Sequence, residues 1–366
     1  VGEDPSTDVA VVKIEPTTGD PFRAYGLGFI GYNRGKRSLA IDLKSEAGRE
    51  AFLELVRHSD AVLDNFRVGV RERLGIDYAS LAAVNPRIIT CSATGYGPVG
   101  PLAADPGFAP LLQARSGMMA AQGGDDEPIF HQIPVNDTAT ALTSAFGILA
   151  ALHARERTGR GQEVFTSLAN QTVMFQSGEL TTYPGAPKPP RGGRDFLGLF
   201  ALRRFYRCAD GWLAIGATQP AHFHGLAKAL GHTEWAGRIV AEAALAEPGN
   251  GELAAQIAAA IAPLARSDAL DRLLMEHVPA APAADRFEMF DHGYLHDNGM
   301  FQETTDHVLG AITTVRAYAE WGRSRTGFEL PGAPGMGEHS RAVLADLGFD
   351  EQRIEALLAA RVVAQH

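Results

Sequence analysis

The alternation of short β-rich runs with helical patterns over residues 1–180 most constrains what this chain can fold into. Residues 46–58 between two such runs form an amphipathic pattern, with Phe52, Leu53, Leu55 and Val56 on one side. Strands that alternate with helices predict βαβ units and a parallel sheet covered on both faces. Ligands of such sheets bind beyond the carboxyl ends of the strands. The candidate strands are VAVVKIE (9–15), SLAIDL (38–43), AVLDNF (61–66), RIITCSA (87–93) and EVFTSLA (163–169).

Residues 137–153 form a second predicted helix, which ends in a basic turn before Gly159. Cations followed by a glycine are typical of a helix C-terminus. Small residues around the helix predict close packing deep in the protein. The large apolar residues that recur at helical spacing are Leu142, Phe146, Leu149 and Leu152.

The second half of the chain has a different pattern, which begins after the Pro- and Gly-rich stretch PGAPKPPRGGR at 184–194. Such a stretch is a linker or an active-site loop. A β-hairpin is predicted around Asp210-Gly211, followed by Ala-rich helices at 221–230, 253–264 and 269–277. A second break, LPGAPGMGEH, occupies residues 330–339. We therefore expect a large parallel-sheet domain in residues 1–185, a smaller α+β domain in 195–325, and a helical tail, 330–366, that returns to the large domain.

Composition excludes several classes of protein. The 366 residues suggest two or three domains, at roughly 150 residues each. The net charge of −10 argues against a nucleic-acid partner but leaves room for a small anionic ligand in a local basic patch. No apolar run reaches about 18 residues without charge, so we expect no membrane span. The start, VGEDPSTD, does not resemble a signal peptide, and Cys91 and Cys208 alone form no disulfide framework; we expect a cytoplasmic protein.

Motif analysis argues against a dinucleotide-binding enzyme, a metal-dependent enzyme and an α/β-hydrolase. Residues 26–31 match G-x-G-x-x-G, but they follow DPFR and lead into YNRG, which is not the strand-to-helix context of a dinucleotide fingerprint. We expect a glycine-rich turn there. The histidines form no metal-binding pattern, and the G-x-S-x-G motif of α/β-hydrolases is absent. We therefore expect no metal site.

Two basic groups lie close to neighbouring predicted strands. The first comprises Arg34, Lys36 and Arg37 before the second strand, with Lys44 just past it. The second, which follows the third strand, comprises Arg67, Arg71 and Arg73. Such clusters are usually solvated surface, although Arg and Lys also hold phosphate groups. Two clusters near adjacent strands are consistent with a polyphosphate ligand.

Asp137 opens the second predicted helix. An aspartate at a helix N-cap is common and has a structural role by itself. The helix dipole would keep its carboxylate ionised, and an ionised carboxylate at a strand-to-helix junction is also what a covalent carboxylate nucleophile requires. Local sequence leaves both interpretations open.

Several segments follow one another along nearly the whole chain: VVKIEPTTGDPFR, NRGKRSLAIDLKSEAGREAF, SDAVLDNFRVGVRERLGIDYASLAAVNPRIITCSATGYGPVGP, LLQARSGMMAAQGG, the Asp137 helix ending in RERTGRGQEV, CADGWLAIGA and PGAPGMGEHSRAVLADLGF. This ordered set resembles the class III CoA-transferase family, which includes formyl-CoA and carnitine CoA-transferases and α-methylacyl-CoA racemases. The resemblance implies a Rossmann-like large domain, a smaller domain and an interlocked homodimer. It also implies that coenzyme A and acyl-CoA bind as substrates, with a small carboxylic acid as the other partner and no permanently bound cofactor.

The resemblance assigns roles to individual residues. Asp137 stands where the transferases have an aspartate that attacks the acyl-CoA thioester and carries CoA as an aspartyl thioester. Gly192 and Gly193 fall where these enzymes have a mobile loop over the reaction centre. The positions that match CoA contacts are Lys36, Arg37, Ile41, Lys44, Asn65, Phe66, Arg73 and Leu74.

Two departures from the family pattern leave alternatives open. The family normally begins with a further strand and an Ala-Gly-Pro segment, and this sequence starts about two dozen residues later; we expect truncation, a separate polypeptide or a fused partner. Family members often have an acidic residue where this chain has Ala109, and racemases place a His-Asp pair at Phe108-Ala109. The main expectation is a CoA-transferase that uses Asp137. The alternatives are an acyl-CoA racemase or epimerase that lacks one proton-transfer group, and a non-catalytic CoA-binding subunit.

Overall fold

The computed structural model describes residues 10–291, 293–316 and 330–366. The VGEDPSTD start, Val9 of the first predicted strand and residues 317–325 of the expected smaller domain lie outside the described residues. The chain divides into two compact units. The first unit comprises Val1–Ser116, Gln132–Ser177 and Gly293–His366, and the second comprises Gly117–His131 and Gly178–His292. The division differs from the expected one because residues 117–131 belong to the second unit and 293–316 to the first.

Strands form at all five positions predicted from the β-rich runs, and the hairpin forms as expected. The strands are β1 (Val12–Glu15), β2 (Arg37–Ile41), β3 (Ala61–Asp64), β4 (Ile89–Thr94), β5 (Glu163–Ser167), β6 (Arg203–Arg207), β7 (Trp212–Gly216), β8 (Ala280–Pro282), β9 (Phe301–Asp306), β10 (Gly310–Val315) and β11 (Val363–Ala364).

The helices of the first unit lie between its strands and in its tail. They are the 3₁₀ helix η1 (Pro21–Tyr25) and the α-helices α1 (Leu27–Asn33), α2 (Glu46–Arg57), α3 (Val70–Leu74), α4 (Tyr78–Val84), α5 (Ala109–Arg115), α7 (Val135–Thr158), α8 (Leu168–Phe175), α15 (Gly293–Asp297), α16 (Ser340–Asp346) and α17 (Glu351–Ala359). Those of the second unit are α6 (Met118–Gly123), α9 (Pro220–Ala229), α10 (Trp235–Arg238), α11 (Ala241–Ala244), α12 (Glu252–Ile261), α13 (Arg266–Met275) and α14 (Arg286–Phe290).

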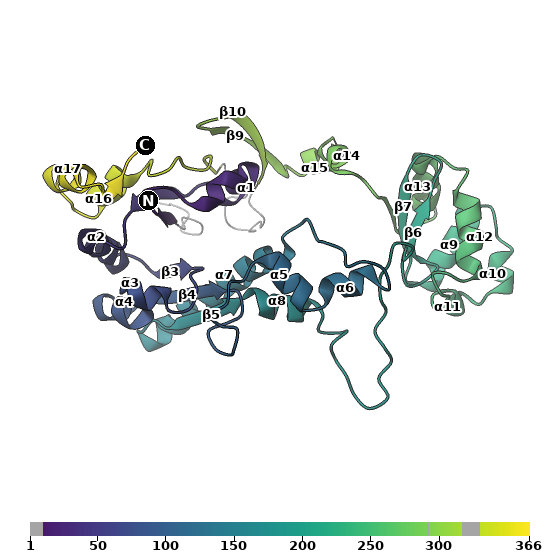
Figure 1. The fold of residues 1–366 in the computed structure, drawn as a ribbon. Helices are drawn as coiled ribbons and strands as arrows, with labels where there is room; N and C mark the ends of the chain where they lie inside the picture. Colours follow the sequence, from purple (N-terminus) through teal and green to yellow (C-terminus); the bar gives the residue numbers. More distant parts are fainter. Residues whose placement is uncertain (1–9, 292, 317–329) are drawn as a thin grey trace. The chain divides into compact units, whose positions relative to one another are not determined.

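The predicted parallel strands form two small sheets in the first unit (Figure 1). In one, β3, β4 and β5 are all parallel, with Asp64 opposite Ser92 and Ser92 opposite Phe165. In the other, β1 pairs with β2 in parallel, and β11 from the C-terminal tail pairs with β2 in antiparallel. The predicted return of the tail to the large domain is thus present as a strand pairing.

Helix α2 connects the two small sheets through its buried face. Ser45 caps its N-terminus by accepting a hydrogen bond from the Gly48 backbone N–H. Ala51 packs in a cluster with residues of β2 and the tail, whereas Phe52 and Val56 pack against residues around β3 and α4. The amphipathic pattern predicted this helix because its apolar stripe has the period of an α-helix.

Helix α7 packs along β4 and β5 in antiparallel orientation. The Ser144 hydroxyl lies 2.7 Å from that of Thr166, and a Cβ on Gly147 would touch Val164. Near the other end of the helix, Arg155 forms a 2.7 Å ion pair with Asp60, which precedes β3. The helix therefore begins at the carboxyl edge of the β3–β4–β5 sheet and ends at its amino edge. It stops, as predicted, at Gly159, whose φ is 71°.

The G-x-G-x-x-G segment is not the glycine-rich turn predicted from sequence. Gly26 is the N-cap of α1, and the remaining residues of the motif form that helix. The preceding 3₁₀ helix, η1, packs its Phe22 ring 6.2 Å from that of Phe29. Tertiary packing thus overrides the low helix propensity of glycine.

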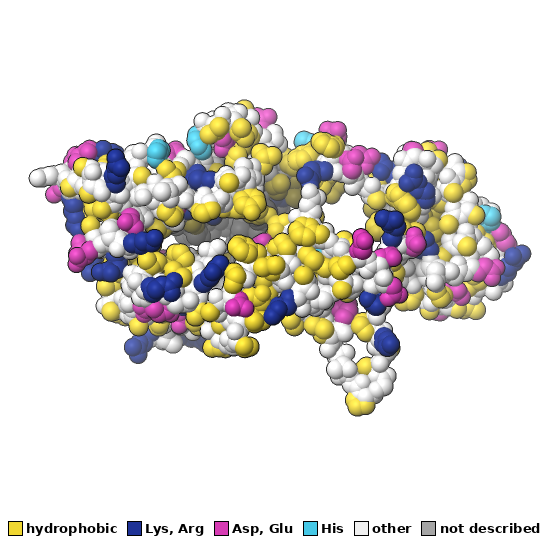
Figure 2. All heavy atoms as spheres, in the orientation of Figure 1, with side chains coloured by type: hydrophobic (Ala, Val, Ile, Leu, Met, Phe, Trp, Pro, Cys, Tyr) yellow, Lys and Arg dark blue, Asp and Glu magenta, His cyan; other side chains and the backbone are white. Residues whose placement is uncertain are grey.

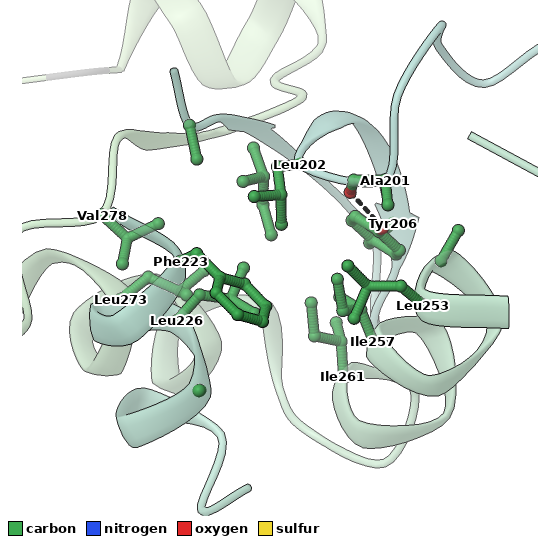
Figure 3. Close-up of a cluster of buried hydrophobic side chains, with 14 of the residues drawn as sticks. Ala201, Leu202, Tyr206, Phe223, Leu226, Leu253, Ile257, Ile261, Leu273 and Val278 are labelled. Carbon is green, nitrogen blue, oxygen red and sulfur yellow. Dashed lines mark hydrogen bonds between the residues drawn. The ribbon is translucent and has the colours of Figure 1, made fainter. Parts of the chain in front are cut away.

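The second unit has its own core beneath the β6–β7–β8 sheet (Figure 3). β6 and β7 form the predicted hairpin, with Arg207 opposite Trp212. In the core, Tyr206 donates its hydroxyl hydrogen bond to the Ala201 carbonyl oxygen, and helices α9, α12 and α13 contribute buried residues such as Phe223 and Ile257. The predicted helices of this unit are all present.

Candidate functional site

The N-terminus of α7 and the ends of β3 and β4 lie at one edge of the β3–β4–β5 sheet. Ligands of parallel sheets bind at this carboxyl edge. The loop after β4 passes close to the segment that leads into α5, because Gly95 and Gly107 face each other without side chains; a Cβ on either would overlap with the backbone of the other. This contact brings α5 close to α7 at the same edge.

Asp137 is in the first turn of α7, but it does not open the helix as predicted. The helix begins at Val135, and Pro134 is the N-cap. The side chain of Asp137 reaches solvent and forms no hydrogen bond or ion pair with the part of the chain that the structure describes. Burial of the carboxyl group raises its pKa above the ordinary value of 3.8. The dipole argument from sequence predicted a stabilised carboxylate, which would have a lowered pKa. The pKa is instead raised, and desolvation is the cause.

Two buried amides beside Asp137 were missed from the sequence. Gln113 of α5 donates from Nε2 to Oδ1 of Asn136 over 3.1 Å. The side chains are 1% and 0% exposed. Asn136 Nδ2 and Gln113 Oε1 have no partner among the described residues. Two spacings in the sequence could have indicated these amides. Asn136 directly precedes the candidate nucleophile, and Gln113 is four residues after Ala109, on the same face of α5.

The residues after β3 are placed where a ligand could reach them. Asn65 and Phe66 directly follow the strand and are exposed. Arg73, near the end of α3, is also exposed and forms no ion pair with the described residues. Leu74, in contrast, packs into the hydrophobic cluster around α2 and α4. Three of the four positions in this segment that were predicted to contact CoA are therefore accessible.

A cavity of about 380 Å³ lies near the same segment, on the sheet face opposite α7. It is lined by Phe66 and Arg67 and by side chains that project from the sheet. Arg71 in this cavity forms a 3.0 Å ion pair with Glu163 and lies 3.9 Å from Asp64. Burial raises the pKa of Asp64, although a hydrogen bond from Ser92 opposes the shift. Arg71 is therefore paired within the protein, whereas Arg67 and Arg73 of the same basic group form no ion pair with any residue that the structure describes.

The other predicted basic group is divided between the two ends of β2. Lys36 and Arg37 are at the amino end, where Lys36 donates to Asn33 over 3.1 Å and Arg37 pairs with Asp346 at 2.7 Å. Burial, assisted by the charge of Lys13, lowers the pKa of Lys36.

The carboxyl end of β2 carries the other two predicted positions. Ile41 is 1% exposed and belongs to the core, and Lys44 is exposed beyond it. Arg34 is buried and donates to Thr314 over 2.9 Å. The cations of this basic group thus lie at opposite ends of β2 and do not form a single phosphate-binding site.

Gly192 and Gly193 belong to the second unit, where they pack against residues 121–124. The Gly192 N–H donates to the Ala121 carbonyl oxygen over 2.7 Å, and Arg191 pairs with Asp125 at 2.7 Å. A Cβ on Gly192 would overlap with the Gln122 carbonyl oxygen, so this crossing requires glycine. The loop is held within its own unit by these contacts.

One face of α7 exposes large apolar side chains, contrary to the prediction that small residues bury the helix all round. Leu142, Phe146 and Leu149 are 64%, 73% and 64% exposed. An apolar cavity of about 390 Å³ lies between this region and α8, and Figure 2 shows hydrophobic side chains gathered over α5 and α8. By length and composition α7 is also apolar enough to cross a membrane, a test that core helices of soluble proteins pass as well. The sequence identified the apolar side chains of this face but not their exposure, because burial depends on what packs against the helix.

No group of three or more His, Cys, Asp or Glu residues able to hold a metal occurs in residues 10–291, 293–316 and 330–366. The chemistry that this site offers is that of one unpaired carboxylate at the carboxyl edge of a parallel sheet. Exposed cations and an exposed aromatic residue follow the neighbouring strands. A carboxylate in this setting is able to act as a nucleophile.

Comparison with known proteins identifies the family. A model of CoA-transferase family III matches residues 10–340. Succinyl-CoA:mesaconate CoA-transferase of Haloarcula marismortui is 33% identical, over 93% of this chain and 90% of that protein. Succinyl-CoA–D-citramalate CoA-transferase of Chloroflexus aurantiacus is 30% identical, over 96% and 91%.

Solved structures agree with this result. A CAIB/BAIF family protein from Brucella suis has a TM-score of 0.78 and 28% identity, with 92% of each chain covered. Rv3272 from Mycobacterium tuberculosis has a TM-score of 0.78 and 26% identity, with 91% of each chain covered. The chain belongs to CoA-transferase family III, whose enzymes use CoA thioesters as substrates.

Proposed function

We propose that this protein is an acyl-CoA:carboxylate CoA-transferase in which Asp137 carries the transferred group. The observation that carries the proposal is the position of Asp137: an unpaired carboxylate, desolvated by its surroundings, in the first turn of a helix that begins at the ligand-binding edge of the sheet. A carboxylate with a raised pKa is poorly solvated and is correspondingly more reactive toward an acyl carbon once it is ionised.

The proposed reaction has four acyl-transfer steps. The Asp137 carboxylate attacks the thioester carbonyl, the C–S bond breaks, and CoA leaves as a thiolate from a mixed anhydride. The thiolate then attacks the aspartyl carbonyl, so that the donor acid leaves as a carboxylate and an aspartyl-CoA thioester remains. The acceptor carboxylate attacks this thioester and releases the thiolate again. The thiolate finally attacks the acceptor's acyl carbon, which frees Asp137 and the new acyl-CoA.

The side chains around the β3–β4–β5 edge support a CoA substrate. Arg67 and Arg73 carry charges that no described residue neutralises, and CoA presents phosphate groups to which Arg binds bidentately. Phe66 offers an exposed ring beside them. We propose that Asn65, Phe66, Arg73 and Lys44 contact CoA. We further propose that the two small sheets are parts of a Rossmann-like arrangement.

Succinyl-CoA is the proposed first donor to test, with small dicarboxylic acids as acceptors. The names of relatives from Haloarcula marismortui, Chloroflexus aurantiacus and Mus musculus contain succinyl-CoA, paired with mesaconate, D-citramalate or glutarate. A relative from Acetobacter aceti, 40% identical over 49% of this chain, is named for acetyl-CoA and oxalate. Donors and acceptors of both kinds should therefore be compared.

Trapping with acyl-CoA tests the role of Asp137. Incubation with succinyl-CoA, followed by borohydride or hydroxylamine and peptide mass spectrometry, is expected to modify Asp137 alone. Asp137→Ala should reduce transfer by roughly a thousandfold or more, the scale seen when a covalent nucleophile is removed. Asp105→Ala, which removes an exposed acid of the same unit, serves as the control.

Three results would contradict the proposal or redirect it. Full activity of Asp137→Ala would exclude the covalent role. Solvent deuterium at the α-carbon of a 2-methylacyl-CoA would instead support a racemase. Tight CoA binding without turnover of any donor would support a non-catalytic subunit; Chloroflexus aurantiacus has relatives named as alpha and beta subunits of one transferase.

We also propose a homodimer, in which a second copy covers the apolar face of α7. Monomeric proteins rarely leave a contiguous apolar patch of this kind in water. The chain's two cysteines, Cys91 and Cys208, are free, which is consistent with the proposed cytoplasmic location. Recovery of the native protein from a membrane or secreted fraction would contradict that location.

A further inference from the structure

The first turn of α7 lacks the side-chain cap that usually holds a helix N-terminus. Its N-cap is Pro134, which forms no side-chain hydrogen bond. The leading N–H groups of a helix have no partner within the helix, and an uncapped first turn frays. Asp137 is in this turn, and no residue in the described part of the chain forms a hydrogen bond or ion pair that would fix the direction of its side chain. Its orientation must therefore come from whatever holds the backbone of the turn.

The Gln113–Asn136 hydrogen bond is a side-chain link between this turn and a neighbouring helix. It joins α5 to α7 over 3.1 Å, between two side chains that are almost fully buried. Thr140 adds a 2.7 Å hydrogen bond from its hydroxyl to the Asn136 carbonyl oxygen within α7. Asn136 is thus held through its side chain and its backbone, one residue before Asp137.

The pair is not what core packing alone would favour. Asn136 Nδ2 and Gln113 Oε1 are buried without a partner among the described residues. Buried polar groups that are left unpaired destabilise a fold, and two apolar side chains could fill the same space without this penalty. Unlike an apolar pair, the amide pair forms a directional hydrogen bond, which fixes the distance and the relative position of the two side chains.

We propose that the Gln113–Asn136 amide pair is a positioning element that aims Asp137 at the acyl carbon of the substrate. This inference rests on the proposed function. Carboxylate and acyl carbon must meet in a near-attack geometry, and a displacement of about 1 Å lowers a rate by roughly a hundredfold. Neither amide touches the substrate; both act through the turn that carries Asp137.

Steady-state kinetics of Asn136→Ala, Gln113→Ala and the double variant test the proposal. Each single change should lower kcat by roughly 10- to 100-fold and leave the KM for acyl-CoA within about twofold. The double variant should lose no more than the worse single variant, because both remove the same bond. Multiplicative losses, or unchanged kcat in both single variants, would overturn it.

Gln171→Ala is the matched control for a purely structural effect. Gln171 is a buried amide on α8 that accepts a 3.2 Å hydrogen bond from Thr143, further along α7. It should lower thermal stability about as much as Gln113→Ala does but leave kcat within about twofold. An equal loss of kcat in Gln171→Ala would show that any loosening of α7 has the same effect, and would contradict a specific positioning role.

A readout without turnover separates this inference from the proposed function. The Asp137 carboxyl signal is followed by ¹³C NMR over pH in labelled ligand-free protein, with Asp137→Asn to assign it. The pKa should move toward its ordinary value in Asn136→Ala, since the loosened turn becomes hydrated, and should not move in Gln171→Ala. If wild type forms no acyl adduct, the proposed function fails; if the pKa is the same in all variants, the positioning inference fails.

Discussion

At the scale of single residues, Asp137 combines exposure of its side chain with desolvation by its surroundings. No cation among the described residues offsets this desolvation, and burial is what raises the pKa of Asp137. A desolvated carboxylate of this kind destabilises the folded state. Its pKa is higher in the folded chain than in the unfolded one, so the folded state is destabilised at every pH where the group is ionised.

Asp137→Asn is therefore expected to stabilise the protein while it abolishes transfer. A group with a raised pKa in the folded state lowers stability above that pKa and has no such effect below its ordinary value of 3.8. The Asn variant should have a higher Tm than wild type at pH 7, and the difference should vanish near pH 3. Differential scanning calorimetry at both values measures it. A lower Tm at pH 7 would show that Asp137 has a stabilising partner in solution.

At the scale of elements, sequence patterns predicted the five parallel strands and the two longest helices of the first unit, but not its short helices α3, α4, α5 and α8 or the β9–β10 hairpin. Helix α2 was predicted because burial of one face imposes an apolar repeat of 3.6 residues. Strands β1 to β5 were predicted because strands that are buried on both faces are short β-rich runs. The predictions for two elements, α1 and α7, were wrong in part. The sequence predicted a turn at α1 because glycines disfavour a helix. Helix α7 begins at Val135, two residues earlier than predicted, with Pro134 as its N-cap.

Glu15 joins β1, η1 and β2 in one buried network. Its side chain is 0% exposed and accepts hydrogen bonds from Arg23 at 2.7 and 2.8 Å, from the Ser38 hydroxyl at 2.6 Å and from the Asp20 N–H at 2.9 Å. Burial alone would raise its pKa, but these donors together lower it below 4.5. Ser38 in turn accepts from the Gly337 N–H over 2.8 Å, which ties the network to the C-terminal tail.

Glu15→Ala should destabilise the protein by about 3 kcal/mol, because Arg23 and Ser38 lose a buried partner. In wild type the contribution of Glu15 is fully present above pH 4.5, the ordinary pKa, and is lost as pH falls through the lowered pKa of the folded state. Denaturant unfolding at pH 7 and at pH 3 should therefore show a large difference between the two proteins at pH 7 and a smaller one at pH 3. An equal difference at both values would contradict a role for the charge.

At the scale of the whole molecule, the described chain leaves surfaces that a compact protein would cover. β1 and β3 are each at the edge of a three-stranded sheet, and the apolar face of α7 is open. Edge strands and apolar faces are where another segment or another chain packs. The proposed homodimer follows from the second of these features.

Phe146→Glu is expected to break the proposed dimer, because it places a charge at the centre of the exposed face of α7. Sedimentation in detergent-free buffer should give twice the chain mass of 39.0 kDa for wild type and the single mass for the variant. Leu274→Glu, at an exposed apolar position of α13, is the control. A monomeric wild type would contradict the proposal, and flotation of wild type with lipid vesicles would show that a membrane covers α7 instead.

The sequence by itself determined the parallel strands with their intervening helices, the hairpin of the second unit and the family. These features depend on local residue patterns and on the order of motifs, both of which can be read directly from the sequence. Only the tertiary structure decided that Arg71 is paired internally, that Leu74 packs into a hydrophobic cluster, and that Gln113 meets Asn136 beside Asp137. Burial, pairing and pKa depend on residues that are distant in sequence and close in space, so no local pattern could predict them.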